Sequence, residues 1–363
     1  MSATPRSTRG QFLQGRSAAD AVVDLIVGDD PSDAPRQAAP GAYLLRLARK
    51  AMACQFEFFF NAGQYPRANE FGLVALDLVD QLENQLSVFR EESEVSRLNR
   101  HASDGPISVE GQLFELLEMS VELFRQTGGA FDVTAGPLSR VWGFVERAGA
   151  VPDTAKLRAA RDRVGSDALR LDRPSSTVQF LKPGVEINLG SIGKGYALDR
   201  CAALLVSAGI GDFLLHGGNS SVLARGAYGA REGADGWMVG VRDPLRPRRR
   251  VGQLVVRDRA LATSGTGVQY FMHDVRRYGH ILDPRTGLPA EGVLSATVLA
   301  PSAAEADALA TAFYVMGPDG VATYCADNPD IAAIIACPGT RGGSVEILRF
   351  GLNDEDWIED DSE

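Results

Sequence analysis

Apolar side chains recur every three to four positions in four stretches of the chain, which is the spacing of an amphipathic helix. Each stretch also carries a residue that favours a helix terminus, such as a serine before it or a glycine after it. The predicted helices run over about 69–89, from a cap at Ser108 to Gly128-Gly129, over about 195–209, and from a capping box at 302–305 to Gly317.

Short apolar runs between these helices predict strands. They cover 185–189, 213–216, 221–224, 237–242, 253–257, 294–300, 331–336 and 345–350. Gly217-Gly218-Asn219 separates two of them and is typical of a hairpin turn. Because short turns join most neighbouring strands and helices occur only at intervals, we expect an α+β fold of mostly antiparallel sheets with packed helices.

Composition divides the 363-residue chain into three parts. Residues 1–42 are rich in Ser, Arg, Pro, Asp and Ala, and predict a mobile N-terminal arm with at most one short helix. Residues 43–350 contain no linker and no internal repeat, and predict one folded domain. Residues 351–363 form an acidic C-terminal tail, which we expect to be a solvated end that aids solubility.

The net charge of −10 comes mostly from that tail. Its last ten residues hold seven acids and no Lys or Arg, so the other residues together carry only −3. A charge this small, without a broad basic surface, argues against nucleic acid as a partner.

The cysteines and the apolar runs exclude other classes of protein. Cysteines at 54, 201, 325 and 337 make no Cys-x-x-Cys pair, so they predict buried thiols rather than a zinc site or disulfides. No apolar run is long enough for membrane insertion. Segment 7–13 lacks the paired arginines of a twin-arginine leader, Asp20 and Asp24 interrupt the stretch after it, and no lipobox cysteine follows. We therefore expect a cytoplasmic protein.

Residues 190–195, Gly-Ser-Ile-Gly-Lys-Gly, join a predicted strand to a helix. The spacing of the glycines matches neither a Rossmann nor a Walker loop. Free backbone N–H groups, the positive end of the helix dipole and Lys194 would still converge there, which favours an anion. Taken alone, such a turn is more often a plain strand-to-helix connection.

Asp307 and Thr311 stand four positions apart in a helix that is otherwise rich in Ala and Leu. They therefore share one face, and a carboxylate beside a hydroxyl in a buried helix needs a partner such as a hard cation. The alternative is that Asp307 faces solvent and Thr311 bonds back to a backbone carbonyl. His280 precedes an Asp283-Pro284 turn, and a lone histidine in that setting is usually structural.

Taken together, five segments resemble the FAD:protein FMN transferase family, the ApbE-like proteins, over about residues 50–350. They are Ser-Val-Phe-Arg at 87–90 with Ser-Glu-Val-Ser-Arg-Leu-Asn at 93–99; Gly-Ala-Phe-Asp-Val-Thr-Ala-Gly-Pro-Leu at 129–138 with Trp142-Gly143; Asn-Leu-Gly-Ser-Ile-Gly-Lys-Gly-Tyr-Ala-Leu-Asp at 188–199; Thr-Ser-Gly at 263–265 with His-Ile-Leu-Asp-Pro at 280–284 and Thr286-Gly287; and Ala-Asp-Ala-Leu-Ala-Thr at 306–311. Any one segment is weak, but five in order are specific. The resemblance implies an α+β fold that binds FAD and a divalent metal, usually Mg²⁺.

The resemblance also implies a role for each matching residue. Those that would contact FAD are Met52, Phe89, Ala130, Phe131, Asp132, Asn188, Lys194 and Ile281, with Met52, Phe89 and Ile281 near the flavin and Asn188 and Lys194 at the ribose or phosphate. Those that would bind the metal are the Ser191 carbonyl, Asp307 and Thr311. His280 would be the general base.

Two positions depart from the family pattern. Asn188 stands where the family commonly has Asp, which removes a charge near FAD. Thr266-Gly267-Val268 replaces a common Asp-Tyr after Thr-Ser-Gly, in a loop that could shape the acceptor-protein site.

Two further segments favour a structural interpretation. The basic run at 246–250 predicts a solvated hairpin loop, with docking of an acidic partner as the alternative. The segment 283–287 partly matches the Asp-x-x-Thr/Ser-Gly-Ala-Thr motif of the family's acceptor proteins, but Leu288-Pro289 breaks the match. We expect a turn there rather than a site of self-modification.

These features lead to one functional hypothesis and two alternatives. The first is a Mg²⁺-dependent FAD:protein FMN transferase, a flavin transferase that moves FMN from FAD to a Thr or Ser hydroxyl of an acceptor protein and releases AMP. The second is a Mg²⁺-dependent FAD pyrophosphatase that yields FMN and AMP. The third is a non-catalytic flavin-binding protein, which would have no need for His280, Asp307 and Thr311 together.

Overall fold

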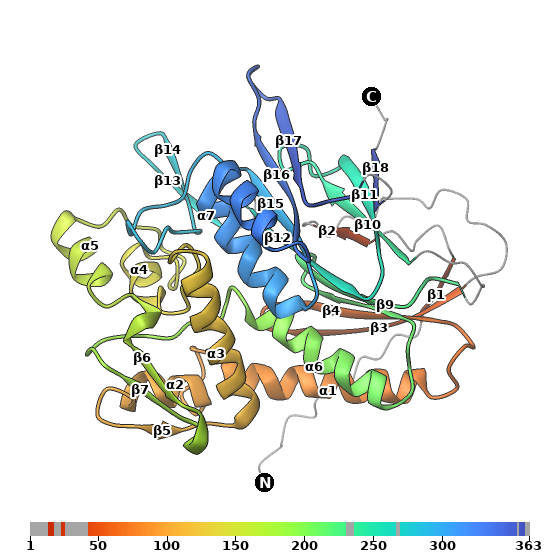
Figure 1. Ribbon diagram of the computed structural model, residues 1–363, viewed down its shortest axis with the longest axis horizontal. Coiled ribbons are helices and arrows are strands. Elements are labelled where there is room, and N and C mark those ends of the chain that lie inside the picture. The colour runs from red at the N-terminus through yellow and green to blue at the C-terminus, as the bar shows by residue number, and fades with distance from the viewer. Residues whose placement is uncertain are drawn as a thin grey trace, which may run out of the picture.

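The computed structural model describes residues 14–17, 23–25, 43–229, 236–265, 269–353 and 356–359. Its centre is a nine-stranded sheet with the order β1-β3-β4-β8-β9-β12-β15-β16-β17 (Figure 1). These strands are β1 (Gln14–Ser17), β3 (Tyr43–Ala51), β4 (Cys54–Asn61), β8 (Phe213–Gly217), β9 (Ser221–Arg225), β12 (Arg259–Gly265), β15 (Ser295–Ala300), β16 (Ala332–Pro338) and β17 (Val345–Phe350). Each neighbouring pair is antiparallel, which confirms the predicted α+β fold.

Three helices cover one face of this sheet: α1 (Ala68–Leu86), α6 (Gly193–Ser207) and α7 (Ala303–Asp327) (Figure 1). Their apolar sides and the facing strands form the largest core, in which Phe56, Phe58 and Phe60 of β4 are fully buried. A shift of β4 by one residue would turn all three rings to the opposite face, so this burial fixes the register of the strand.

A four-stranded sheet, in the order β18-β11-β10-β2, covers the other face. Its strands are β2 (Val23–Leu25), β10 (Trp237–Arg242), β11 (Arg250–Val256) and β18 (Trp357–Glu359). The core between the two sheets holds Phe59, Leu214 and Trp237. Strands β4 and β8 are therefore apolar on both faces, and their sequences lack the alternation of a half-exposed strand.

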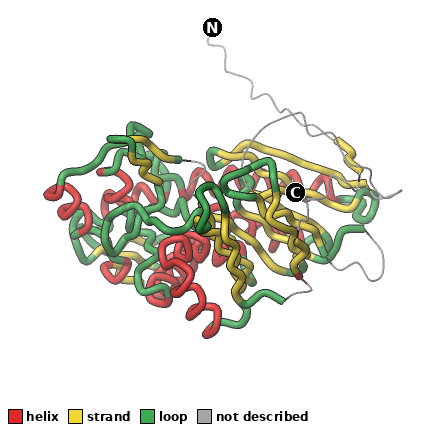
Figure 2. Tube along the Cα trace, turned by 90° about the horizontal axis from the view of Figure 1, so that it is seen from above, coloured by secondary structure: helices red, strands yellow, loops and turns green. Residues whose placement is uncertain are grey.

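The remaining elements form a lobe of helices and loops beside the strands, as Figure 2 shows from above. Its elements are α2 (Glu94–His101), α3 (Gly111–Gln126), α4 (Gly136–Val141), α5 (Thr154–Arg161), the 3₁₀ helices η2 (Ser166–Ala168) and η3 (Arg173–Ser175), a sheet of β5 (Ile107–Ser108), β7 (Thr177–Phe180) and β6 (Leu169–Asp172), and the hairpin of β13 (Tyr270–His273) and β14 (Arg276–Gly279).

The four predicted helices are all present, with two differences at their ends. α3 begins at Gly111 because the Glu110 side chain accepts a hydrogen bond from the Leu113 N–H, so the predicted cap at Ser108, which lies in β5, is wrong. α7 has the predicted Ser302 cap and leaves helical geometry at Gly317, as predicted, but helix resumes to Asp327. Pro318 stands at the first turn of that second segment, where its missing N–H costs nothing.

The strand predicted at 185–189 is wrong. This segment belongs to no sheet among the described strands, and the Asn99 side chain bonds both the N–H and the C=O of Ile187, at 2.7 and 2.9 Å. An amide side chain thus replaces a neighbouring strand. The other predicted strands are confirmed to within a few residues, including the hairpin of β8 and β9.

The structure describes only parts of the two chain ends. Within 1–42 it describes β1, which pairs with β3, and β2, which runs parallel to β10. In the acidic tail, β18 pairs with β11 and Trp357 is buried between the sheets, so this part of the tail is packed rather than solvated. The division into arm, domain and tail otherwise stays a prediction. No helix among the described residues is long and apolar enough to span a membrane.

The N-terminal halves of α6 and α7 cross in close contact. A methyl group on Gly195 would lie 1.9 Å from the Ala303 carbonyl oxygen, so only glycine allows this approach. The Gly195 N–H donates to the Asp307 carboxylate at 2.7 Å. In return, the Asp199 carboxylate accepts the N–H groups of Ala303 and Ala304, both at 2.8 Å. Each helix thus supplies the carboxylate that satisfies free N–H groups of the other.

We expect Gly195→Ala to lower the free energy of unfolding by about 2 kcal/mol or more, because the added methyl overpacks a backbone contact that cannot move without separating the helices. Denaturant unfolding measures the change. Gly111→Ala, in the first turn of α3 with open space around the added methyl, is the control and should be neutral or stabilising by up to about 1 kcal/mol. Equal stability of the two variants would contradict the close crossing of α6 and α7.

Candidate active site

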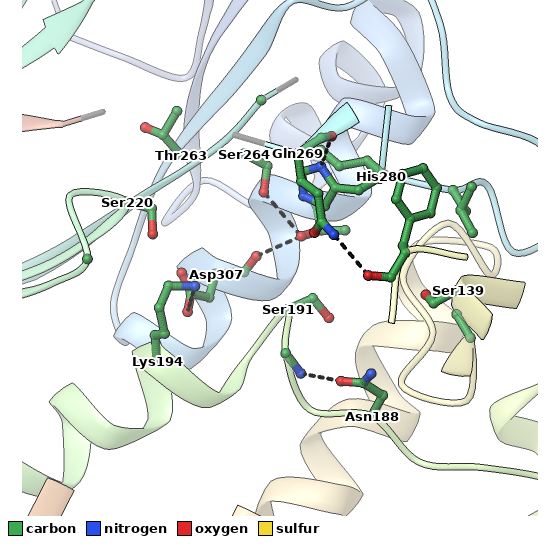
Figure 3. Close-up of a pocket in the computed structure, with 18 of the residues that line it drawn as sticks. Ser139, Asn188, Ser191, Lys194, Ser220, Thr263, Ser264, Gln269, His280 and Asp307 are labelled. Atoms are coloured by element: carbon green, nitrogen blue, oxygen red, sulfur yellow. Dashed lines mark hydrogen bonds and ion pairs between the residues drawn. The ribbon is translucent and has the colours of Figure 1, made fainter. Parts of the chain in front are cut away.

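A pocket of about 590 Å³ opens where the α6–α7 crossing meets the ends of β9 and β12 and the turn that carries His280 (Figure 3). Eleven of the twelve residues that the sequence singles out line it: Phe89, Ala130, Phe131, Asp132, Asn188, Ser191, Lys194, His280, Ile281, Asp307 and Thr311. Segments more than two hundred residues apart thus meet in one cavity, which is of the size that holds a cofactor.

Met52 is the expected residue that does not line the pocket. It lies in the tight turn between β3 and β4 with φ of 49°, and its side chain packs against the main core. Cys54, two positions further along, lines the cavity instead. Burial raises the pKa of the Cys54 thiol to about 11, so this group is a neutral thiol and not a nucleophile near neutral pH.

The floor of the pocket is built around Asp307, which is buried and does not face solvent. Its Oδ2 accepts the Gly195 N–H and its Oδ1 accepts the Ser221 hydroxyl at 2.5 Å. The Lys194 ammonium lies 3.6 Å from Oδ2. These contacts hold the carboxylate in one orientation and still leave lone pairs of both oxygens available.

Thr311 lies one turn further along α7, on the same side as Asp307. Its hydroxyl lies 3.1 Å from the Ser264 hydroxyl at the end of β12, and 3.4 Å from the Asp307 carbonyl oxygen. The back-bond to a carbonyl is therefore present but long, while the contact to Ser264 connects α7 to the sheet. Figure 3 shows Ser220, Thr263 and Ser264 on the strand side of the pocket, so this wall carries several hydroxyl groups.

The N-terminus of α6 provides the positive side of the pocket. The N-cap residue Ile192 makes no side-chain hydrogen bond, the Gly195 N–H is bonded to Asp307, and Lys194 is the second residue of the helix. Gly190 and Ser191, in the turn just before the helix, line the cavity. The positive end of the helix dipole and an ammonium group therefore face the same space, which is a suitable environment for a phosphate.

His280 lies opposite Lys194 and Asp307, directly after β14 (Figure 3). Its Nδ1 lies 3.0 Å from the Gln269 carbonyl oxygen, which can only accept, so Nδ1 carries the proton and Nε2 keeps a lone pair. The Gln269 side chain donates to the Phe144 carbonyl at 2.9 Å and fixes this arrangement. Burial, helped by the nearby Lys194 charge, lowers the pKa of His280. A neutral imidazole with a free nitrogen in the pocket wall is a suitable proton acceptor.

Asp132 and Asn188 shape the loops at the pocket's other side. The Asp132 carboxylate accepts hydrogen bonds from Thr134 and Ser166, at 2.6 to 2.8 Å for the Oδ1 contacts. The Asp132 side chain therefore stabilises its own loop, and the backbone of that loop is the part available to contact a ligand. Asn188 Oδ1 accepts the Gly190 N–H at 2.9 Å, so the amide supports the glycine turn without a charge.

Sequence reasoning missed several residues of the pocket. Ser220, Gln269 and Phe144 line it, but none belongs to a distinctive local pattern. Ser264 lies in the Thr263-Ser264-Gly265 segment, yet its role depends on the approach of α7. Residues 266–268, which depart from the family pattern, lie outside the described residues.

The turn and loop predictions near the pocket hold. Residues 283–287 form the expected turn, in which the Gly287 N–H donates to the Asp283 carbonyl at 2.7 Å. Residues 246–249 of the basic run lie in the connection between β10 and β11, as expected for a hairpin loop, and are exposed, while Arg250 is the first residue of β11. Neither docking of an acidic partner on that run nor self-modification of the turn is tested by these contacts.

Comparison with known proteins gives a consistent result. The sequence model of the ApbE family matches residues 55–335. An FAD:protein FMN transferase of Vibrio cholerae is 35% identical over 263 residues, which cover 71% of this chain and 77% of the relative. Another of that name from Treponema pallidum is 34% identical over 275 residues, covering 73% and 76%.

Solved structures agree with the sequence comparison. The ApbE protein of Thermotoga maritima superimposes with a TM-score of 0.75 at 29% identity, over 84% of this chain and 96% of that one. The flavin transferase ApbE of Vibrio cholerae gives a TM-score of 0.74 at 29% identity, over 85% and 98%.

We expect the His280 ring to titrate below pH 6.5 and to be neutral at pH 7, because burial disfavours the charged imidazolium. An NMR titration of the histidine ring protons measures this pKa, with His280→Ala to assign the signal. Any reaction that uses this nitrogen as a base should then persist through pH 6.5 and decline only at lower pH. A His280 pKa at or above 6.5 would contradict the geometry described here.

Proposed function

Since this chain belongs to the ApbE family and is an FAD:protein FMN transferase, we propose that its pocket holds FAD with Mg²⁺ and delivers FMN to an acceptor hydroxyl. The acceptor would be a threonine or serine of another protein, and AMP would leave. One observation carries the proposal: a neutral histidine and the Lys194–Asp307 pair line a single pocket.

The reaction requires one proton transfer and one substitution at phosphorus. His280 Nε2 would take the proton of the acceptor hydroxyl. The hydroxyl oxygen would then bond to the phosphorus on the FMN side of the pyrophosphate, and the bond from that phosphorus to the AMP oxygen would break. AMP would leave with the electron pair of that bond. The enzyme forms no covalent intermediate in this scheme, so its main contributions are position and charge.

Lys194 and the α6 N-terminus would hold the pyrophosphate. The ammonium lies 3.6 Å from Asp307 and can reach a phosphate oxygen by a side-chain rotation, while the positive end of the helix dipole is fixed in position. Phe89, Phe131 and Ile281 offer apolar surface for the flavin, and Phe89 is 75% exposed at the rim, where a bound ring could cover it. Asn188 replaces the commoner carboxylate, which removes a repulsion near the phosphates.

The residues on the pocket floor fit Mg²⁺. Asp307 supplies a carboxylate and Thr311 a hydroxyl on one helix face, and the Ser191 carbonyl would complete the protein ligands. Within the described residues, no group of three or more His, Cys, Asp or Glu side chains could hold a metal ion by itself. Mg²⁺ does not need such a group, because it favours few protein ligands together with phosphate oxygens and waters. The ion would neutralise charge on the pyrophosphate when bound. A cytoplasmic location stays a prediction from the sequence.

The direct test is incubation of the protein with FAD, Mg²⁺ and a purified protein that carries an Asp-x-x-Thr-Gly-Ala-Thr segment. Mass spectrometry should find the added mass of FMN on a threonine of that segment. His280→Ala should bind FAD nearly normally but transfer FMN about 10²–10⁴ times more slowly. Rapid AMP release without an acceptor would instead support the pyrophosphatase. Tight FAD binding without turnover would support a flavin carrier, and wild-type rates in His280→Ala would remove this base from the mechanism.

We expect Asp307→Asn to raise the Mg²⁺ concentration needed for half-maximal activity by about tenfold or more, because it removes the charged ligand. Stability should change little. The asparagine oxygen can still accept the Gly195 N–H, and its NH₂ group can donate to the Ser221 hydroxyl. Activity measured against Mg²⁺ concentration, beside a denaturant unfolding curve, separates the two effects.

Asp199→Asn is the matched control, since Asp199 is the other carboxylate of the α6–α7 crossing and does not line the pocket. It should lower stability and leave the Mg²⁺ requirement unchanged. An Asp307→Asn variant that behaves in the same way would remove Asp307 from the metal site.

A further inference from the structure

The hairpin of β13 and β14 projects from the lobe (Figure 1), and His280 directly follows β14. Gln269, just before β13, and His280, just after β14, close its base through the His280 N–H bond to the Gln269 carbonyl at 3.2 Å. The hairpin and the proton acceptor are therefore one structural unit, and a molecule bound along β13 would lie close to His280.

One edge of β13 is open. In an antiparallel pair, residues that hydrogen-bond to the opposite strand alternate with residues that do not. Gln269 bonds to His280 just before β13, and the register places Phe271 opposite Tyr278 two positions further along, so the backbone groups of Phe271 face β14. The backbone groups of Tyr270 and Met272 consequently point away from β14. Of the strands that the structure describes, only β14 pairs with β13. Such an edge can accept an additional strand.

The hairpin is held firmly on the lobe, as a docking edge must be. Phe271 stacks on Tyr278 at 5.2 Å and packs against Phe144 at 5.5 Å, while Trp142 lies 5.6 Å from Tyr278. Tyr270 and Met272, on either side of Phe271, are 50% and 57% exposed. The Arg277 guanidinium lies 3.9 Å from the centre of the Tyr270 ring, and the rest of that ring and Met272 expose apolar surface on this hairpin.

A second cavity, of about 340 Å³, lies along the start of β13. Gln269 and Phe144 line both this cavity and the catalytic pocket, so the two spaces meet at the residue that orients His280. Arg147 lines its outer side and is exposed, and within the described residues no acidic side chain pairs with it. The neighbouring Glu146 instead pairs with Arg140 at 3.7 Å.

We propose that the open edge of β13 binds an extended segment of the acceptor protein as an added strand, which brings the acceptor hydroxyl over Gln269 to His280. Main-chain hydrogen bonds to Tyr270 and Met272 would hold the segment, and its apolar side chains would cover those two residues. An acidic side chain near the hydroxyl would pair with Arg147. This inference rests on the proposed function, because it explains how a protein substrate reaches the base.

The test compares Met272→Pro with Met272→Ala in the full-length enzyme, using the purified acceptor that carries the Asp-x-x-Thr-Gly-Ala-Thr segment. Proline removes the outward N–H and blocks the edge, but the bonds to β14 remain. Alanine removes the same side chain and keeps the N–H. We expect the KM for the acceptor to rise about tenfold or more in Met272→Pro relative to Met272→Ala, with the Kd for FAD unchanged.

Arg277→Pro, compared with Arg277→Ala, is the control for proline itself, because Arg277 is the cross-strand partner of Met272 and its backbone points to the opposite edge of the hairpin. The Arg277 guanidinium lies 3.9 Å from the centre of the Tyr270 ring, and both variants lose this contact equally. Arg277→Pro should leave the acceptor KM close to the Arg277→Ala value. Equal KM values in the two proline variants would overturn the proposal, and so would a change of oligomeric state in Met272→Pro, since the edge would then pair with a second copy.

A photo-crosslinking amino acid gives a second measurement that does not depend on how proline is tolerated. Placed at position 272, it should capture the acceptor, whereas at the exposed Val74 of α1 it should not. Equal capture at both positions would overturn the docking site. Failure of the wild-type enzyme to label the acceptor would instead overturn the proposed function, which distinguishes the two outcomes.

Discussion

The reciprocal hydrogen bonds between α6 and α7 are the constraint on which the candidate active site depends. Gly195 allows the helices to touch, and Asp307 and Asp199 each satisfy N–H groups of the opposite helix. Burial raises the pKa of Asp199 to about 6, so these hydrogen bonds form where water is largely excluded. In that environment an unpaired N–H or carboxylate would be costly, so the crossing has one well-defined geometry.

The same contact between α6 and α7 positions the charged residues of the pocket. Asp307 is both a structural acceptor and the floor of the pocket, and Lys194 precedes the glycine that makes the contact. A carboxylate that served only as a ligand could rotate, whereas this one is fixed by a backbone N–H and the Ser221 hydroxyl before any ligand binds. Pre-organisation of this kind lowers the cost of binding a charged substrate.

The candidate active site also lies between two parts of the molecule. The helix–sheet part holds Asp307, Thr311 and Lys194, while the lobe and its hairpin hold His280. Within the second part, the Gln269 carbonyl fixes the tautomer of His280, and the Gln269 amide is bonded to Phe144. On our proposals, FAD would be held mainly by the first part and the acceptor protein by the second, and the reacting atoms would meet at their boundary.

The sequence by itself determined the antiparallel α+β class, the four main helices, most of the strands it singled out and, through five ordered segments, the family. Local spacing suffices for these features because helix caps, apolar periodicity and glycine turns act over a few residues. Tertiary structure decided the rest. The sequence could not show that the Asn99 side chain bonds to Ile187 in place of a neighbouring strand, or that Met52 packs against the core. It also could not show that the Asp132 carboxylate accepts hydrogen bonds from nearby loop residues. Nor could it show that Gln269 orients His280 or that β13 keeps an open edge. Each of these depends on which distant side chain occupies a particular hydrogen-bonding position, and only the packing of the whole chain fixes that.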